Sequence, residues 1–117
     1  MKRPEQAIQR NVFEHFRVRG APGVFAFHVP NGGYRRKVEA AILRGIGTVA
    51  GVPDVCAIKG GKAFFLELKA EGGRLTKAQE QTLIDLRAAG AMATHAHGLD
   101  QALRVLEGWG LLLGRMT

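Results

Sequence analysis

Asp54, Glu67 and Lys69 are the side chains of this sequence whose types and spacing could do chemistry. The dipeptide Gly60-Gly61, which lies between them, is typical of a two-residue hairpin turn. If that dipeptide is the turn, facing residues have numbers that sum to 121, so Asp54 lies opposite Glu67 with the Cβ atoms about 5 Å apart. Lys69 follows Glu67 by two residues and therefore points to the same face of its strand. Two acids and a lysine on one face can bind a divalent cation and act on a phosphodiester bond.

A surface hairpin with a cross-strand ion pair is the alternative interpretation of these residues. Such pairs are common and contribute little to stability. Against this alternative, Glu67 and Lys69 interrupt an apolar run over residues 63–68 and lie at its end. That position is where a catalytic site at the end of a strand would be.

Hydrophobic periodicity and turn residues predict the elements that must position these side chains. Helices are expected over residues 5–17, 36–44, 76–89 and 100–109, and strands over 24–29, 54–58, 63–69 and 91–96. Thr76 and Gln79 have the capping-box pattern of a helix start, and Asp100 could cap the last helix. The order α-β-α-β-β-α-β-α predicts an α/β fold with a central mixed sheet flanked by helices.

The amino-acid composition indicates which class of molecule the protein binds. The chain has 117 residues, which suits one domain over residues 1–117, and 17 Lys and Arg against 10 Asp and Glu give a net charge of +7. A basic protein favours a polyanion, and nucleic acid is preferred over a membrane because no basic amphipathic helix or membrane-length apolar run is evident. Cys56 is the single cysteine, which excludes an intrachain disulfide and a cysteine-based zinc site. No apolar signal region follows Met1, so a cytoplasmic protein is expected.

The central residues resemble the signature of the PD-(D/E)XK nuclease superfamily, which is an acid after proline at one strand and acid-x-lysine on the next. Within that superfamily, nearly the whole chain resembles the VRR-NUC (virus-type replication-repair nuclease) family, in the minimal stand-alone form found in bacteria and their phages. The matching blocks are Glu5 in the first helix, Val29-Pro30-Asn31-Gly32-Gly33, Gly51-Val52-Pro53-Asp54, Glu67-Leu68-Lys69, and Gln79 after a basic loop.

This resemblance implies a restriction-endonuclease-like core and a metal-dependent DNA nuclease related to archaeal Holliday-junction resolvases. Mg²⁺, or Mn²⁺ in its place, would be held by Asp54 and Glu67, and the resemblance adds the Leu68 carbonyl as a third ligand. Lys69 would orient or deprotonate the attacking water or stabilise the pentavalent state, or it could simply balance the acids.

Two more residues, Glu5 and Gln79, can either belong to the catalytic site or serve only the helix in which they lie. Glu5 stands at the family's helix position, where an acid can reach the metal, but it would also suit the first helical turn by its charge. Glu14 is the competing acid. Gln79 could hydrogen-bond the active lysine or a phosphate, or serve only the helix cap, and both roles can hold together.

Basic residues form two clusters near the predicted site. Their members are Arg35, Arg36, Lys37 and Arg44 in the first cluster, and Lys62, Arg74 and Lys77 in the second. They predict contacts to the DNA backbone, although a solvated surface is the usual fate of such runs. Asn31, followed by two glycines, could present backbone amides to a phosphate or form only a turn. The histidines His15, His28, His95 and His97 are interpreted as non-catalytic.

The predicted function is therefore cleavage of branched DNA, most specifically the resolution of four-way (Holliday) junctions in recombination and DNA repair by a homodimer, because two matched nicks need two sites. The alternatives are a nuclease for flaps, nicks or single strands, a non-cleaving DNA-binding module of the same fold, and a structural partner in a phage or repair assembly. The apolar tail over residues 109–113 closes the core or covers a partner.

Overall fold

The computed structural model describes residues 3–30 and 37–115, and the predicted order of elements is confirmed. The elements are α1 (Arg3–Arg19), β1 (Phe25–Phe27), α2 (Lys37–Gly45), β2 (Val55–Lys59), β3 (Lys62–Lys69), α3 (Lys77–Ala88), β4 (Met92–His97) and α4 (Leu99–Gly108). The strand expected over residues 24–29 is shorter than predicted, because only residues 25–27 pair with β2. No described helix has the length and apolar character needed to cross a membrane.

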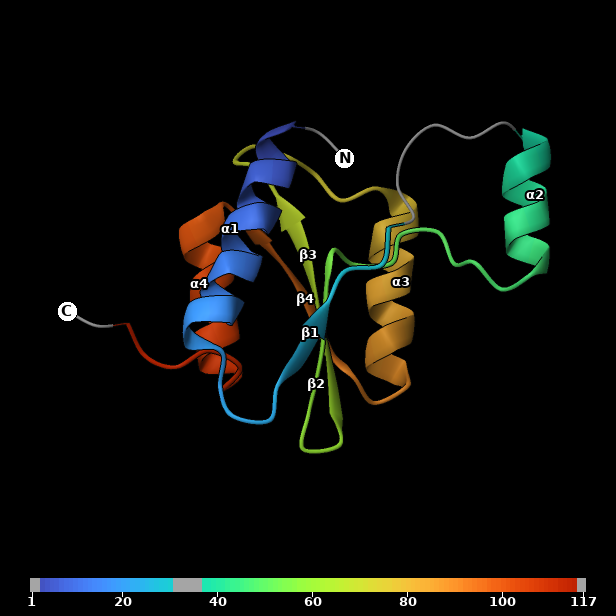
Figure 1. Ribbon diagram of the computed structural model, residues 1–117. Coiled ribbons are helices and arrows are strands. Elements are labelled where there is room, and N and C mark those ends of the chain that lie inside the picture. The colour runs from blue at the N-terminus through green and yellow to red at the C-terminus, as the bar shows by residue number, and fades with distance from the viewer. Residues whose placement is uncertain (1–2, 31–36, 116–117) are drawn as a thin grey trace.

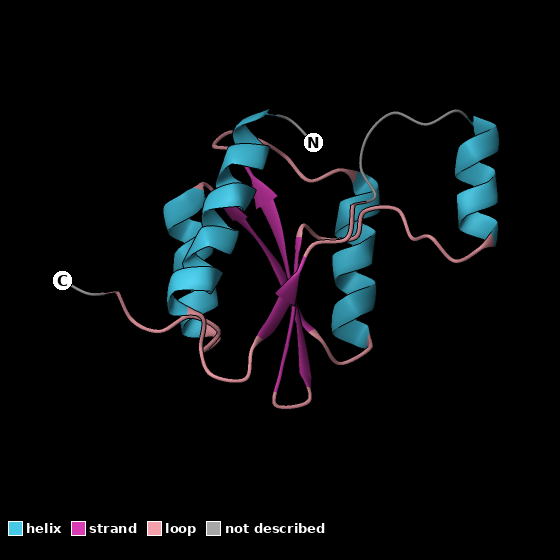
Figure 2. Ribbon diagram, viewed as in Figure 1, coloured by secondary structure: helices cyan, strands magenta, loops and turns pink. Residues whose placement is uncertain are grey.

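The four strands form one mixed sheet in the order β1-β2-β3-β4 (Figure 2). β2 is antiparallel to β1 and β3, whereas β3 and β4 are parallel. In the β2–β3 hairpin, Val55 faces Leu66 and Lys59 faces Lys62, so the predicted register is confirmed. Gly60 and Gly61 have φ of 58° and 78°, as a type I′ turn requires at both central positions.

Helices cover the sheet on both sides (Figure 1). α1 and α4 pack against one face, and α3 packs against the other. Side chains alternate along β3, so Leu66 and Leu68 enter the core between the sheet and the α1–α4 pair, where they meet Val12 and Leu106. Glu67 and Lys69 therefore point to the side of the sheet that α3 covers.

Local sequence signals explain how the last two helices begin. The capping box is confirmed: Gln79 N donates to Thr76 Oγ1 at 3.1 Å, and Thr76 N donates to Gln79 Oε1 at 2.9 Å. The prediction that Asp100 caps α4 is wrong, because Gly98 occupies the N-cap with φ 82°. Gly98 N donates to the Lys69 carbonyl at 2.8 Å, which binds the end of β4 to β3 and starts the helix earlier.

The apolar tail closes the core, which is one of its two predicted roles. Leu111 and Leu112 are buried. Leu112 forms an isolated bridge with Gly20, and Leu113 N donates to the Arg19 carbonyl at 2.8 Å. The tail therefore joins the end of α4 to the end of α1.

Gly51 fixes the loop that leads into β2. It has φ 77°, and a Cβ atom on it would lie 2.6 Å from the Ala78 carbonyl oxygen. Beside it, Thr82 Oγ1 donates to the Ala50 carbonyl at 2.7 Å. The loop is thus held against α3 just before Asp54.

We expect Gly51→Ala to destabilise the protein more than Gly72→Ala. Both glycines have φ 77°, but a Cβ atom at Gly72 meets nothing within 4 Å. Gly72→Ala therefore measures the cost of left-handed backbone alone, about 1–2 kcal/mol, whereas Gly51→Ala must also move the Ala78 backbone. Urea denaturation of the two variants gives the comparison, and equal losses would show that the close approach at Gly51 does not matter.

Candidate functional site

The site lies where β2 begins and β3 ends. Asp54 directly precedes β2, and continuation of the hairpin register sets it opposite Glu67, on the same face as Lys69. Only 9% of Asp54, 3% of Glu67 and 7% of Lys69 is exposed. Charged side chains are rarely buried unless they are paired, so three at one strand end form a specific arrangement.

Backbone and side-chain contacts hold both acids in place. Leu68 N donates to Asp54 Oδ2 at 2.9 Å, and Gln79 Nε2 donates to Glu67 Oε2 at 3.1 Å. Lys69 Nζ lies 3.8 Å from the same Glu67 oxygen. Each carboxylate is therefore oriented by a hydrogen bond that another residue donates to it.

The acids interact strongly with each other. Burial, then the charge of Asp54 and the hydrogen bond that protonated Glu67 donates to Asp54, raises the pKa of Glu67 to about 9. Burial also raises the pKa of Asp54, although the hydrogen bond from the Leu68 amide opposes this shift. Two carboxyl groups this close resist ionising together, and the charge of Lys69 offsets the upward shift in the pKa of Glu67 only in part.

The Leu68 carbonyl is available as an additional oxygen ligand. Its amide faces Asp54, and the carbonyl of a strand residue points to the same side as its amide. The residue opposite Leu68 in the extended register is Pro53, which has no N–H to donate. Ladder pairing therefore cannot satisfy this carbonyl.

The donor set fits a hard divalent cation. Two carboxylates and a carbonyl are the oxygen ligands that Mg²⁺ prefers, with waters completing the coordination. Among the residues that the structure describes, no three His, Cys, Asp or Glu side chains are grouped to hold a metal ion by themselves. Two carboxylates and one carbonyl would leave the remaining coordination positions of such a cation to water or substrate.

Glu5 lies beside the site and Glu14 does not. Glu5 is 8% exposed, its Oε2 accepts a hydrogen bond from Ala70 N at 3.4 Å, and its charge acts on Asp54. Glu14 instead forms an exposed ion pair with Arg17. The N-terminal ends of α1 and α3 also lie at the same end of the molecule as the end of β3 (Figure 1), and positive helix ends favour anions there.

Gln79 forms the predicted helix cap, and its second hydrogen bond goes to Glu67, which was not among its predicted partners. Its amide oxygen accepts from Thr76 N in the capping box, while its amide nitrogen donates to Glu67. Burial of the Glu67 carboxyl beside α3 makes this double contact possible. The same side chain thus connects the start of α3 to the acid on β3.

The sequence did not predict that His95 and His97 lie beside the site. In the parallel β3–β4 pair, His95 faces Glu67 and His97 faces Lys69, so both lie on the face of the site. Burial, and then the charge of His97, lowers the pKa of His95 below its usual value. His28 Nδ1 lies 2.7 Å from the Asp54 carbonyl oxygen and holds the start of β2 from the other side.

The basic residues that were predicted to contact DNA lie at different distances from the site. Arg74 and Lys77 are exposed in the loop and first turn before Gln79, next to the site. Lys62 lies at the hairpin end of β3, five residues and roughly 17 Å from Glu67 along the strand. Two predicted contacts, Lys37 and Arg44, lie on α2, and three, Asn31, Arg35 and Arg36, lie outside the described residues.

Comparison with known proteins identifies the fold. No family model matches the chain, and no curated protein matches its sequence. A solved structure named VRR_NUC domain protein is 22% identical with a TM-score of 0.74, over 93% of this chain and 89% of its own. A second, named VRR_NUC domain, is 20% identical with a TM-score of 0.63, over 91% and 97%.

A third solved structure is Hjc from Archaeoglobus fulgidus, a Holliday junction resolvase from an archaeal hyperthermophile. It is 18% identical with a TM-score of 0.51, over 80% of this chain and 67% of its own. These similarities extend across the sheet and the helices that carry the site. The chain therefore has the fold of these VRR_NUC domain structures.

Proposed function

We propose that this protein is a metal-dependent, structure-selective DNA endonuclease, formed by one nuclease domain over residues 1–117, that resolves four-way junctions as a homodimer. The observation that carries the proposal is the burial of Asp54, Glu67 and Lys69 together at one strand end of a nuclease fold. Buried acids that repel each other weaken a fold unless a cation binds between them. The similarity to Hjc, a Holliday junction resolvase, supports the choice of substrate.

Asp54, Glu67 and the Leu68 carbonyl would hold Mg²⁺, with Mn²⁺ as a substitute. When bound, the cation supplies positive charge that activates a water and offsets charge on the phosphoryl oxygens. The chain's own contribution is orientation, since the Leu68 amide and Gln79 each fix one carboxylate. Glu5 adds a further acid at the edge of the site.

Lys69 is the residue proposed to act on the attacking water. Its ammonium group lies on the same face as both acids and has three N–H donors, so it can orient a water beside the phosphate or donate to the developing negative charge. Burial beside the acids limits the motion of its side chain. We therefore assign to Lys69 the orientation of the attacking water and the stabilisation of the developing negative charge.

Arg74 and Lys77 are proposed to bind phosphates next to the cleaved bond, because they are exposed beside Gln79. The residues at a distance from the site would contact more remote parts of a branched substrate. These are Asn31, Arg35, Arg36, Lys37 and Lys62. Such contacts position the DNA without reading its sequence.

The homodimer is proposed to form through α2. This nine-residue helix projects away from the sheet (Figure 1) and has no buried residue. Its apolar side chains Val38 and Ile42 are 70% and 59% exposed. A short helix is marginal in water without a packing surface, and a second copy of the same helix offers a matching apolar face around a two-fold axis.

We expect purified protein to cleave a labelled four-way junction with Mg²⁺ or Mn²⁺, as paired symmetric nicks. Asp54→Ala and Lys69→Ala should fold and bind DNA but cleave at least about 100-fold more slowly, because each removes a group that acts on the transition state. The assay compares junction, flap, nicked, single-strand and linear duplex substrates, with chelator as the control.

Each alternative function has its own outcome in this assay. Cleavage confined to flaps, nicks or single strands would replace the junction as the substrate. DNA binding without metal-dependent cleavage of any substrate would identify a non-cleaving DNA-binding module. Full activity of Asp54→Ala would refute the assignment of the site.

We expect Glu67→Gln to remove most of the pH dependence of stability in chelator. Folding raises the pKa of Glu67 from 4.5 to about 9, so the folded state binds more protons than the unfolded chain within this window. The free energy of unfolding of the wild type should therefore fall as the pH rises through it, by at most about 1.4 kcal/mol per pH unit.

Urea denaturation at pH 6, 7.5 and 9 measures this slope in both proteins. Mg²⁺ should then stabilise the wild type more than Glu67→Gln, most clearly at high pH. Parallel pH profiles for the two proteins would contradict the proposed protonation of Glu67.

We expect Val38→Glu/Ile42→Glu to convert a dimer into a monomer, because charges would enter the proposed apolar interface. The matched control is Val18→Glu/Ile84→Glu, whose side chains are 75% and 54% exposed on α1 and α3. Light scattering coupled to size exclusion gives the mass, and circular dichroism checks folding. Dissociation by the control pair alone would locate the interface away from α2.

A further inference from the structure

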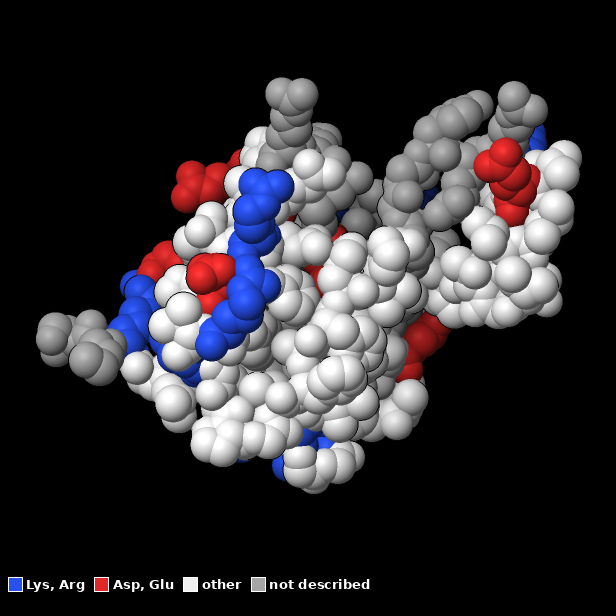
Figure 3. Space-filling view, in the orientation of Figure 1, with Lys and Arg blue, Asp and Glu red and all other residues white. Residues whose placement is uncertain are grey.

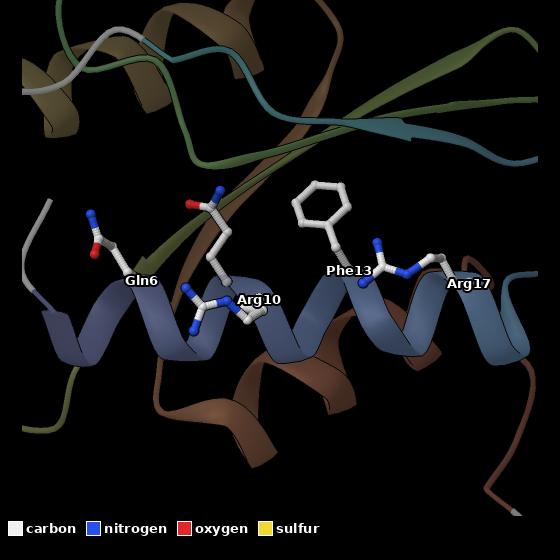
Figure 4. A pocket seen from close by; sticks show the side chains of 5 residues that line it. Gln6, Arg10, Phe13 and Arg17 are labelled. Carbon is white, nitrogen blue, oxygen red and sulfur yellow. The ribbon is translucent and has the colours of Figure 1, made fainter.

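The outer face of α1 carries a row of polar and basic side chains that none of the proposed roles uses. Gln6, Arg10, Phe13 and Arg17 are spaced by four, three and four residues, so they follow one another along one side of the helix (Figure 4). Together with Gln9 they line an open depression of about 380 Å³. We call these five residues the α1 track.

Both arginines of the α1 track can accept an anion. Arg10 is exposed and makes no hydrogen bond or ion pair with any described residue. Arg17 pairs with Glu14, but the two side chains are 63% and 59% exposed, and such surface pairs are weak. In the space-filling view, Lys and Arg atoms form a strip along α1 (Figure 3).

The other members complete a surface suited to a nucleic acid backbone. Phe13 packs partly into the core and offers a ring between the arginines, against which a sugar can lie. The amide oxygen of Gln9 is buried without a hydrogen-bond partner among the described residues. A buried polar atom of this kind is uncommon.

The α1 track begins at the candidate active site. Glu5, one residue before Gln6, contacts the Ala70 amide, and its charge acts on Glu67. From Glu5, Arg10 lies five residues and about 7.5 Å along the helix axis, and Arg17 lies twelve residues and about 18 Å along it. At about 3.4 Å per nucleotide of a duplex strand, these distances correspond to about two and about five nucleotides.

We propose that the α1 track binds the phosphate backbone of the duplex arm next to the cleaved bond, and so aligns that arm with the active site. The proposal rests on the proposed DNA endonuclease function and names a contact surface for it. Arginine suits this role because its planar guanidinium group donates two parallel hydrogen bonds to a phosphate. The contact is independent of base sequence, as a structure-selective nuclease requires.

The test measures binding of a fluorescent four-way junction in chelator, so that no cleavage is needed. Each lost phosphate contact should make the plot of log K against log salt concentration less steep by about 0.9. We expect this change for Arg10→Gln and for Arg17→Gln, and about twice the change for the double variant. The matched control is Arg104→Gln, on α4, whose side chain is 76% exposed and pairs with Asp100.

Arm length gives a second, geometric readout. Shortening the junction arms to about three base pairs beyond the cleaved bond should abolish the effect of Arg17→Gln and keep that of Arg10→Gln. An acidic protein partner or a merely solvated surface would not produce this dependence on the DNA arm. Arg17→Gln with the same effect on short and long arms would overturn the proposed alignment.

The outcomes separate this inference from the endonuclease proposal. If Arg10→Gln and Arg17→Gln behave like Arg104→Gln while the wild type binds and cleaves DNA, the α1 track is refuted and the nuclease stands. If the track variants change the salt slope but no substrate is cleaved with Mg²⁺, the track stands and cleavage is refuted. A wild type that binds no DNA would overturn both.

Discussion

The register of the β2–β3 hairpin is the constraint on which the site depends. Side chains alternate between the two faces of a strand, so a slip of one residue would exchange the two faces completely. Leu66 and Leu68 would then face α3 and solvent, while Glu67 and Lys69 would enter the core. The apolar face and the two-glycine turn require the same register, and this agreement makes the position of the acids unambiguous.

Burial of the two acids lowers the stability of the protein, and the rest of the fold offsets this loss. The two acids are buried on one face, whereas Phe64, Leu66 and Leu68 of β3 are buried in the core on the opposite face. Hydrogen bonds from the Leu68 amide and Gln79 orient the acids but do not neutralise them. The divalent cation that we propose would supply the missing charge, which gives a physical reason to retain this arrangement despite its cost to stability.

Two helices extend the site in different ways. α1 begins at the site with Glu5 and continues as a basic face, which suits the arm of a DNA substrate. α2 stands apart from the sheet and exposes apolar side chains, which suits a second copy of the chain. A dimer with two such sites would present paired active centres to a branched substrate that itself has approximate two-fold symmetry.

Local patterns in the sequence determined the order of elements, the hairpin register and the capping box at Thr76, because turn chemistry and side-chain periodicity act over a few residues. Tertiary structure alone decided the parallel pairing of β3 with β4, which brings His95 and His97 beside the site. It also decided the second hydrogen bond of Gln79, to Glu67. These features depend on which distant segments bury their apolar faces together, and no local spacing encodes that choice.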